Sequence, residues 1–308
     1  MTPLTIDRVA EIFTNEDLQY RIGDEPNILL SGFPNTAVAL IIDGDTLKFE
    51  GRWRGEPPST DAPTILAVVN EWNLTQIMPA LHFVETTPGT LALIVHRELL
   101  TEGGVSRNQL GAFITSSIHN TLACFNWLEE QFPTLVTWET PQQKQPRLKE
   151  QPTMSEQVTS VTFDDVVNVM GEFGITLTLA DDEPIGSANL NGYNVTFALV
   201  NNTAVIVRAD KTTEEKVADG NPTFFLACNH FNAYVHSTKA AAVNRTEMVI
   251  IRTECEFIVA AGLTHEQLKT YLKSSVDNVL AAQENVAQLA ASLQGNGNTE
   301  SEAKDTDN

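Results

Sequence analysis

The chain has 308 residues, of which 42% are hydrophobic, and it carries a formal net charge of −21. This length predicts about two domains, each long enough to bury one hydrophobic core. The negative charge argues against binding to nucleic acids or anionic membranes, because both depend on Lys and Arg, and it favours solubility and basic partners.

The first predicted elements are a helix, three strands and a second helix. Thr5 can cap a helix that runs to about residue 17, with Val9, Ile12 and Phe13 on one face. Asp43-Gly44-Asp45 is typical of a hairpin turn between two strands. The predicted strands cover 27–33, 36–43 and 46–53, and the second helix covers 60–75.

Two more strands and a long helix complete the first half. The strands are expected at 81–86 and 90–97, and apolar residues at helical spacing predict a helix from about 106 to 130. The segment 139–158 is rich in Pro and Gln, which cannot build a core, so we expect a linker there.

The second half of the chain repeats the first. Residues 63–73 and 222–232 share four of eleven positions, and further echoes relate 105–123 to 263–281 and 4–9 to 161–166. The offset stays between 157 and 159 residues throughout. A constant offset over a whole half indicates a duplicated domain.

The repeat predicts the elements of the second half. Strands are expected at 192–200, 204–209, 240–244 and 248–253, with a helix at 221–234 between the two pairs. Thr264 and Gln267 form a predicted capping box for a last helix that reaches about Leu293. Its apolar seam has heptad-like spacing, so this helix should pack along another element. The seam consists of Leu272, Val276, Val279, Gln283, Val286, Ala290 and Leu293.

These elements predict an α+β fold with two tandem copies of an α-β-β-β-α-β-β-α domain, each with one antiparallel sheet. The expected divisions are copy one at 1–138, the linker at 139–158, copy two at 159–294 and a disordered acidic tail at 295–308.

Several short motifs resemble the YbjN family of bacterial proteins. They are the run from Val69 to Asn73 followed by Pro79, the segment 109–130 of the last helix, and Arg52-Trp53-Arg54 at the end of the third strand. Copy two keeps Asn229 and Asn232 but has Phe231 in place of Trp72 and no Arg-Trp-Arg, so it looks like a diverged structural partner.

The resemblance implies a sensory-transduction regulator with a fold similar to that of type III secretion chaperones. Such chaperones are small acidic α+β proteins that dimerise and bind extended segments of other proteins. We therefore expect a non-catalytic, chaperone-like module whose two domains form an internal pseudo-dimer, with a protein or peptide client for which basic character is favoured. A homodimer in addition is left open. The alternative is a small-molecule-binding regulator or an unrecognised enzyme, with a pocket between helix two and the sheet.

The candidate partner-binding residues are Arg52, Trp53, Arg54, Asn70, Trp72 and Asn73. The Arg-Trp-Arg run is a rare basic spot that could grip an anionic ligand or stack on a partner, or could guard an exposed strand end. Core packing is the default role for a tryptophan, with a peptide contact as the alternative.

Asn70 and Asn73 are three residues apart and therefore share one face of helix two, as Asn229 and Asn232 do. They could form a polar recognition face, or they could tie the helix to the following loop through backbone hydrogen bonds. Their retention in both copies favours the structural role.

No motif predicts a cofactor, a metal or a catalytic centre. Cys228 and His230 point to different faces of a helix, and the chain lacks a nucleotide-binding glycine motif and a G-x-S-x-G elbow. The start of the chain does not resemble a signal peptide, no apolar run spans a membrane, and three widely spaced cysteines suggest reduced thiols. These features together predict a cytoplasmic protein.

Overall fold

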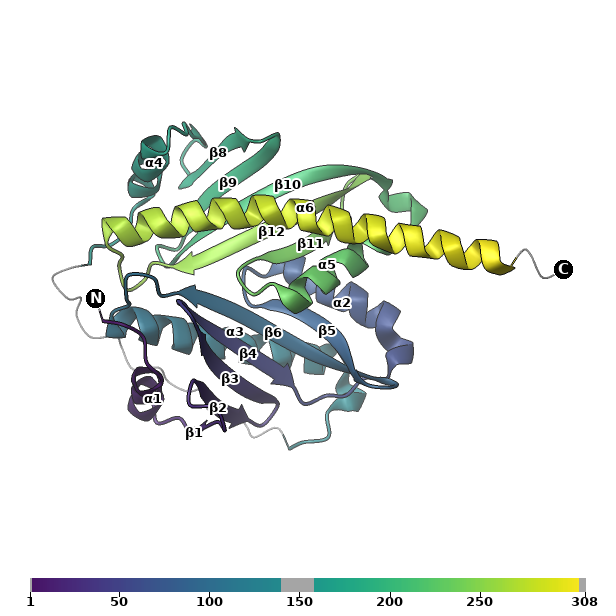
Figure 1. Ribbon diagram of the computed structural model, residues 1–308, viewed down its shortest axis with the longest axis horizontal. Coiled ribbons are helices and arrows are strands. Elements are labelled where there is room, and N and C mark those ends of the chain that lie inside the picture. The colour runs from purple at the N-terminus through teal and green to yellow at the C-terminus, as the bar shows by residue number, and fades with distance from the viewer. Residues whose placement is uncertain (1, 140–157, 305–308) are drawn as a thin grey trace.

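The computed structural model describes residues 2–139 and 158–304, with side chains up to Gln294. The first half contains one six-stranded sheet and three α-helices (Figure 1). Its elements are α1 (Ile6–Asn15), β1 (Arg21–Ile22), β2 (Ile28–Phe33), β3 (Thr36–Asp43), β4 (Thr46–Trp53), η1 (Ser59–Asp61), α2 (Ala62–Thr75), β5 (Ala80–Thr87), β6 (Thr90–Leu100), α3 (Arg107–Gln131) and η2 (Pro133–Leu135).

The second half follows the same order. Its elements are α4 (Phe163–Glu172), β7 (Thr178–Leu179), β8 (Ile185–Leu190), β9 (Tyr193–Val200), β10 (Ala204–Lys216), η3 (Val217–Asp219), α5 (Thr223–Tyr234), β11 (Lys239–Val243), β12 (Met248–Ile258) and α6 (His265–Lys304).

The two sheets have equivalent topologies, which confirms the predicted α+β fold. The strand orders are β1-β2-β3-β4-β6-β5 and β7-β8-β9-β10-β12-β11, and all pairs are antiparallel. Each sheet also has a two-residue first strand, β1 or β7, that the periodicity did not predict because two residues carry no alternation pattern.

Local capping explains where the long helices begin. Ser106 and Gln109 form a capping box at the start of α3, and Thr264 and Gln267 bond in the same reciprocal way before α6. Thr5 caps α1 by accepting from the amide of Arg8, as the sequence predicts.

Each core lies between a sheet and its helices. In the first half, Val9 and Phe13 of α1 and Phe113 of α3 cover Leu40 and Phe49 of the sheet. In the second half, the predicted seam of α6 is buried or half-buried along its whole length against the second sheet and α5. The amide of Gln283, a polar member of that seam, donates to the carbonyls of Ala209 and Ile251.

Several boundaries differ from the sequence predictions, and two differ most. Strand β10 runs to Lys216 rather than 209, because its polar end continues to pair with β12. Helix α6 runs to Lys304 instead of ending near Leu293 (Figure 1). Residues 140–157 of the predicted linker and 305–308 of the predicted tail lie outside the described residues, so the linker stays a prediction. Helix α6 covers residues 295–304 of the predicted tail, and disorder stays a prediction for 305–308 alone.

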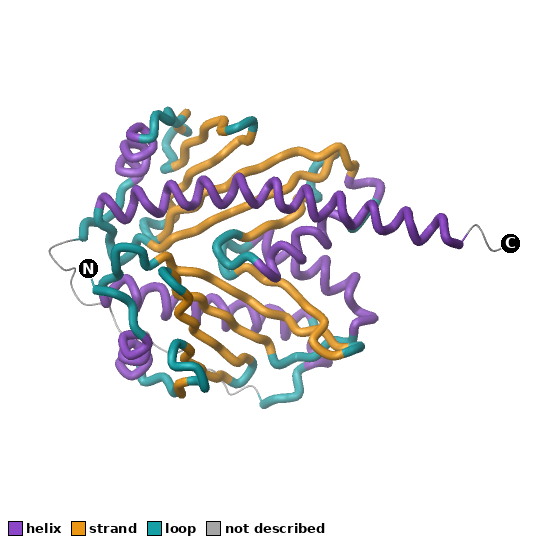
Figure 2. The backbone as a smooth tube through the Cα atoms, in the orientation of Figure 1, coloured by secondary structure: helices purple, strands orange, loops and turns teal. Residues whose placement is uncertain are grey.

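The two halves meet through their second helices and sheet edges. Helix α5 contacts β5 of the first sheet, α2 contacts β11 of the second sheet, and α2 and α5 contact each other. Figure 2 shows the two sheets side by side with these helices between their edges, and α6 extending beyond the second sheet. Within the described part of the chain, no helix is long and apolar enough to cross a membrane.

Candidate functional site at the interface of the two halves

Two asparagines join the halves by reciprocal hydrogen bonds to backbone. Asn70 of α2 donates from Nδ2 to the carbonyl of Ala242 on β11, and its Oδ1 accepts from the Ala242 amide, both at 2.9 Å. Asn229 of α5 makes the same pair of bonds to Phe83 on β5, both at 3.0 Å. Each helix therefore satisfies the edge strand of the opposite sheet, and an exposed strand edge is avoided on both sides.

The other asparagine of each pair binds its own half. Asn73 pairs with the amide and carbonyl of Leu81, and Asn232 pairs with those of Ala240. The structural role favoured by the sequence is thus present at these two positions. The cross-half bonds of Asn70 and Asn229 were not predicted, because a sequence does not say which strand edge faces a helix.

A glutamine pair extends the twofold pattern to the other end of the interface. Gln109 Nε2 donates to Oε1 of Gln267 at 3.0 Å, and Gln267 Nε2 lies 3.3 Å from Oε1 of Gln109. The same two amides donate to the carbonyls of Gly262 and Gly104, respectively. At both the asparagine and the glutamine contacts, each half therefore makes to the other the same bonds that it receives.

Three histidine rings stack at one side of the interface, and a glutamate bonds to the last of them. The rings of His82 and His96 are 5.4 Å apart, and those of His96 and His236 are 4.7 Å apart. His236 Nε2 lies 3.0 Å from Oε1 of Glu50, and this hydrogen bond lowers the pKa of Glu50. Burial lowers the pKa of His82 to about 4 and holds that of His96 well below its usual value, so both rings are neutral near pH 7.

A cationic cluster occupies the equivalent place on the other side. Lys239 contacts Glu254 at 2.9 Å and donates to the carbonyls of Gln76 and Ile77 in the first half. Arg208 also contacts Glu254. Burial lowers the pKa of Lys239, which Glu254 partly opposes. The three charges pair with one another within the second half, as buried charges must, and only Lys239 also bonds across the interface.

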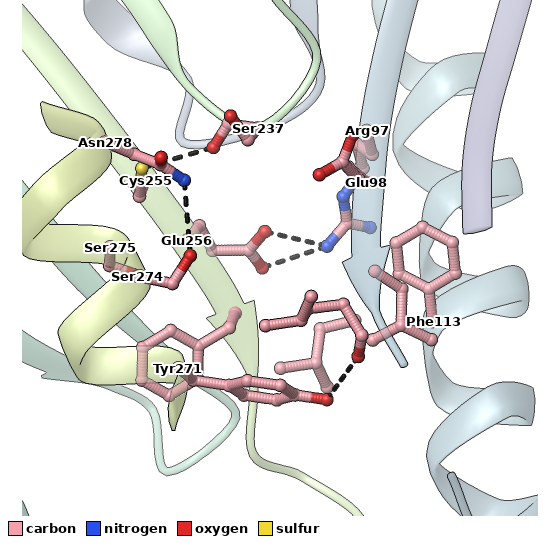
Figure 3. A pocket seen from close by; sticks show the side chains of 14 residues that line it. Arg97, Glu98, Phe113, Ser237, Cys255, Glu256, Tyr271, Ser274, Ser275 and Asn278 are labelled. Carbon is pink, nitrogen blue, oxygen red and sulfur yellow. Dashed lines mark hydrogen bonds and ion pairs between the residues drawn. The ribbon is translucent and has the colours of Figure 1, made fainter. Parts of the chain in front are cut away.

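Near the centre, a buried ion pair joins β6 to β12. Arg97 Nη2 contacts both oxygens of Glu256, at 3.0 and 2.8 Å, and the two side chains are only 3% and 8% exposed. Next to this pair lies a cavity of about 70 Å³ (Figure 3). Its lining comes from both halves and includes Glu98, Cys255, Tyr271 and Ser274.

The structure buries four of the six candidate partner-binding residues. Trp53 packs edge-on against Trp138, with ring centroids 5.9 Å apart. Trp72 packs against Trp127 and donates from Nε1 to the carbonyl of Pro79. Together with the bonded side chains of Asn70 and Asn73, these residues make internal contacts, and their role in binding a partner stays a prediction.

Arg52 on β4 and Arg54, directly after its end, are both exposed. Arg54 donates from Nε to the carbonyl of Phe33 on β2. The two arginines of the run thus lie together, and its tryptophan points into the core.

A shallow depression of about 410 Å³ lies beside these arginines. It is lined by the segments 19–21, 30–32 and 37–38, and we call it the edge trough. Strand β1 pairs only with Leu29 and Leu30, so the outer edge of β2 from Ser31 to Phe33 has no strand partner among the described residues. Tyr20 and Ile22 remain 40% and 42% exposed at this edge.

No metal centre is found in the described residues: no three His, Cys, Asp or Glu side chains there could hold an ion together. The three cysteines are buried and unpaired, and burial raises the pKa of each thiol. Sequence reasoning missed the histidine stack and the Arg97–Glu256 pair, because their members lie far apart in the chain. An alignment of the β6 sequence with that of β12 could have shown that Arg97 and His96 are replaced by Cys255 and Glu254 in the second copy.

Comparisons with known proteins match one family. A family model, YbjN, described as "Putative bacterial sensory transduction regulator", matches residues 5–130. No curated protein matches the chain.

Two solved structures are similar to parts of the chain. One is the E. coli YbjN protein, described as a "putative transcription regulator", with 13% identity over 46% of this chain and 96% of that chain, at a TM-score of 0.35. The other is the Yersinia pestis type III secretion chaperone SycH, solved with a fragment of YscM2, with 12% identity over 39% of this chain and 99% of that chain, at a TM-score of 0.28. The similarity to the YbjN family thus covers residues 5–130, within the first half of the chain.

Proposed function

We propose that this protein is a non-catalytic, chaperone-like regulatory module that binds an extended segment of a client protein. The two halves act as one body, because the side chains of Asn70 and Asn229 occupy the backbone groups of Ala242 and Phe83 on the inner sheet edges. The second half is then a diverged second copy of the YbjN-like domain, and the pseudo-dimer takes the place of a dimer of single domains.

The edge trough is the observation that carries this proposal. An extended peptide can add a strand to an unpaired sheet edge, where backbone bonds give affinity and side-chain contacts give specificity. The free edge of β2 offers the bonds, Tyr20 and Ile22 offer apolar contact, and Arg52 lies opposite Ala37, which lines the trough. The two arginines favour an acidic group in the client segment beside them, whereas the net charge of −21 favours a client that is basic elsewhere.

Site-specific photo-cross-linking in the native host tests the proposal. A photoreactive residue replaces the exposed Ala37 in the trough, and the control replaces the exposed Asp277 on α6. We expect one recurrent protein adduct from position 37, absent from the control and lost with the double change Arg52→Glu and Arg54→Glu. The same adducts from both positions, or none from position 37, would contradict client binding at the trough.

A small-molecule regulator is the second candidate, favoured by a cavity of about 260 Å³. This cavity lies between α2 and the second half, with Leu66, Val217 and Phe225 in its lining, and not between helix two and its own sheet. A thermal-shift screen distinguishes the candidates: stabilisation by one metabolite class, lost on Leu66→Trp, would favour the regulator. A cytoplasmic location belongs to the proposal and is supported by the three unpaired cysteines.

A further inference from the structure

The central strands of the two halves are equivalent residue by residue, and one pair of positions differs sharply in size. Strands β6 and β12 begin and end at matching positions, so Arg97 corresponds to Cys255 and Glu98 to Glu256. The sheet registers agree, since Arg97 lies opposite Phe49 and Cys255 lies opposite Val207, its counterpart. One half thus has a long cation where the other has a small thiol.

In the first half the cation is fully accommodated. The guanidinium of Arg97 donates from Nη2 to Glu256 of the opposite half and from Nη1 to Ser116 and Ser117 of α3, at 3.0 and 3.1 Å. It also lies over the ring of Phe113, 5.3 Å from its centroid. Carboxylate, hydroxyls and ring together form a complete guanidinium site.

The second half has the same groups without the cation. Glu98 stands for Glu256, Ser274 and Ser275 of α6 stand for Ser116 and Ser117, and Tyr271 stands for Phe113. All four line the cavity of about 70 Å³, and Cys255 stands where the arginine would be rooted (Figure 3). The cavity is large enough for several water molecules, each of which needs roughly 10–15 Å³ by this measure.

The carboxylate of Glu98 is available for a ligand. No hydrogen bond or ion pair joins it to another side chain in the described part of the chain, whereas Glu256 is bonded by both oxygens. Burial raises the pKa of Glu98, and this effect is partly opposed by His236 and by Lys48, which lies opposite Glu98 on β4. Glu98, Ser274 and Asn278 are half-buried, so solvent reaches the cavity.

We propose that this cavity binds a guanidinium group brought by a ligand, held by Glu98, Ser274 and Ser275 beside the ring of Tyr271. The group could come from an arginine side chain of another protein or from a free small guanidinium compound. This site is separate from the edge trough and does not depend on the proposed function.

Isothermal titration of the full chain with L-argininamide tests the site, with the uncharged L-citrullinamide as the ligand control. We expect saturable binding of argininamide and none of citrullinamide. The change Glu98→Gln should weaken binding by about tenfold or more, because it removes the charged acceptor, while the exposed control Glu102→Gln should not. Failure of argininamide to bind at millimolar concentration, or equal binding to both Glu variants, would overturn the proposal.

A second variant fills the site from within. Cys255→Arg places in the second half the residue that the first half already has, so it should abolish argininamide binding. If circular dichroism shows that Cys255→Arg does not fold, the smaller change Ser274→Ala takes its place, and it should weaken argininamide binding. Unchanged binding in a folded Cys255→Arg protein would contradict the site.

The relative affinities of two probes show whether the guanidinium group comes from a protein or from a small compound. A capped Ala-Arg-Ala peptide that binds more tightly than methylguanidinium indicates a protein side chain. The opposite order indicates a small compound. Binding of neither probe contradicts the site itself.

Discussion

Replacing Asn70 with Ala should destabilise the whole protein strongly, although it removes only one polar side chain. Asn70 is only 6% exposed, and its two bonds at 2.9 Å satisfy both backbone groups of Ala242, which is fully buried. Each buried group left unsatisfied costs about 1–3 kcal/mol. Allowing for some entry of water, we expect a loss of roughly 2–4 kcal/mol, a large part of the 5–15 kcal/mol typical of a folded protein.

Urea unfolding followed by two probes measures this loss. All four tryptophans lie in the first half, between residues 53 and 138, so their fluorescence reports on that half, whereas circular dichroism reports on both. In the natural protein the two transitions should coincide, and in Asn70→Ala both midpoints should fall. Asn229→Ala should have the same sign of effect.

The neighbouring Glu71→Ala is the matched control. Glu71 pairs with Arg245, but the two side chains are 47% and 59% exposed, so its loss should cost less than about 1 kcal/mol. An Asn70→Ala protein as stable as the Glu71→Ala protein would refute the role of the cross-half bonds.

Two further outcomes are expected. Burial lowers the pKa of His82, beside His236 and Glu50, to about 4, whereas an unfolded histidine titrates near 6.5. The contribution of His82 to folding stability should therefore be fully present above about pH 6.5 and should fall as the pH drops toward 4. Urea midpoints across this range measure the effect, and a His82→Gln protein with the same pH dependence as the natural protein would count against it. Arg97→Ala leaves Glu256 buried without its cation and should cost about 3–5 kcal/mol, whereas Arg107→Ala, at an exposed pair with Glu11, should cost less than about 1 kcal/mol; equal costs in thermal or urea unfolding would show that the buried pair has no special role.

Much of the fold follows from local patterns in the sequence. The constant offset between the two copies predicts the repeated order of helices and strands, and capping residues such as Thr5 and Thr264 mark where helices begin. The seam of α6 is also predicted, because heptad-like spacing depends only on neighbours along one helix.

The interface could not be predicted in the same way. Asn70 and Asn73 look equivalent in the sequence, yet Asn73 binds its own strand and Asn70 binds a residue in the other half. Which strand edge a helix faces depends on how the halves pack, and that packing is not encoded in local periodicity. The Arg-Trp-Arg run shows the same limit: alternation along β4 buries Trp53 and exposes the two arginines, so a single motif contributes to two different surfaces.

Amide hydrogen exchange at the inner strand edges tests the packing of the halves most directly. The amides of Leu81 and Ala240 are bonded within their own halves, whereas those of Phe83 and Ala242 are bonded only across the interface, to Asn229 and Asn70. We predict that all four amides are protected, and that Asn229→Ala releases Phe83 while leaving Leu81 protected. Rapid exchange of Phe83 and Ala242 in the natural protein, with Leu81 and Ala240 still protected, would show that the halves do not form the pseudo-dimer.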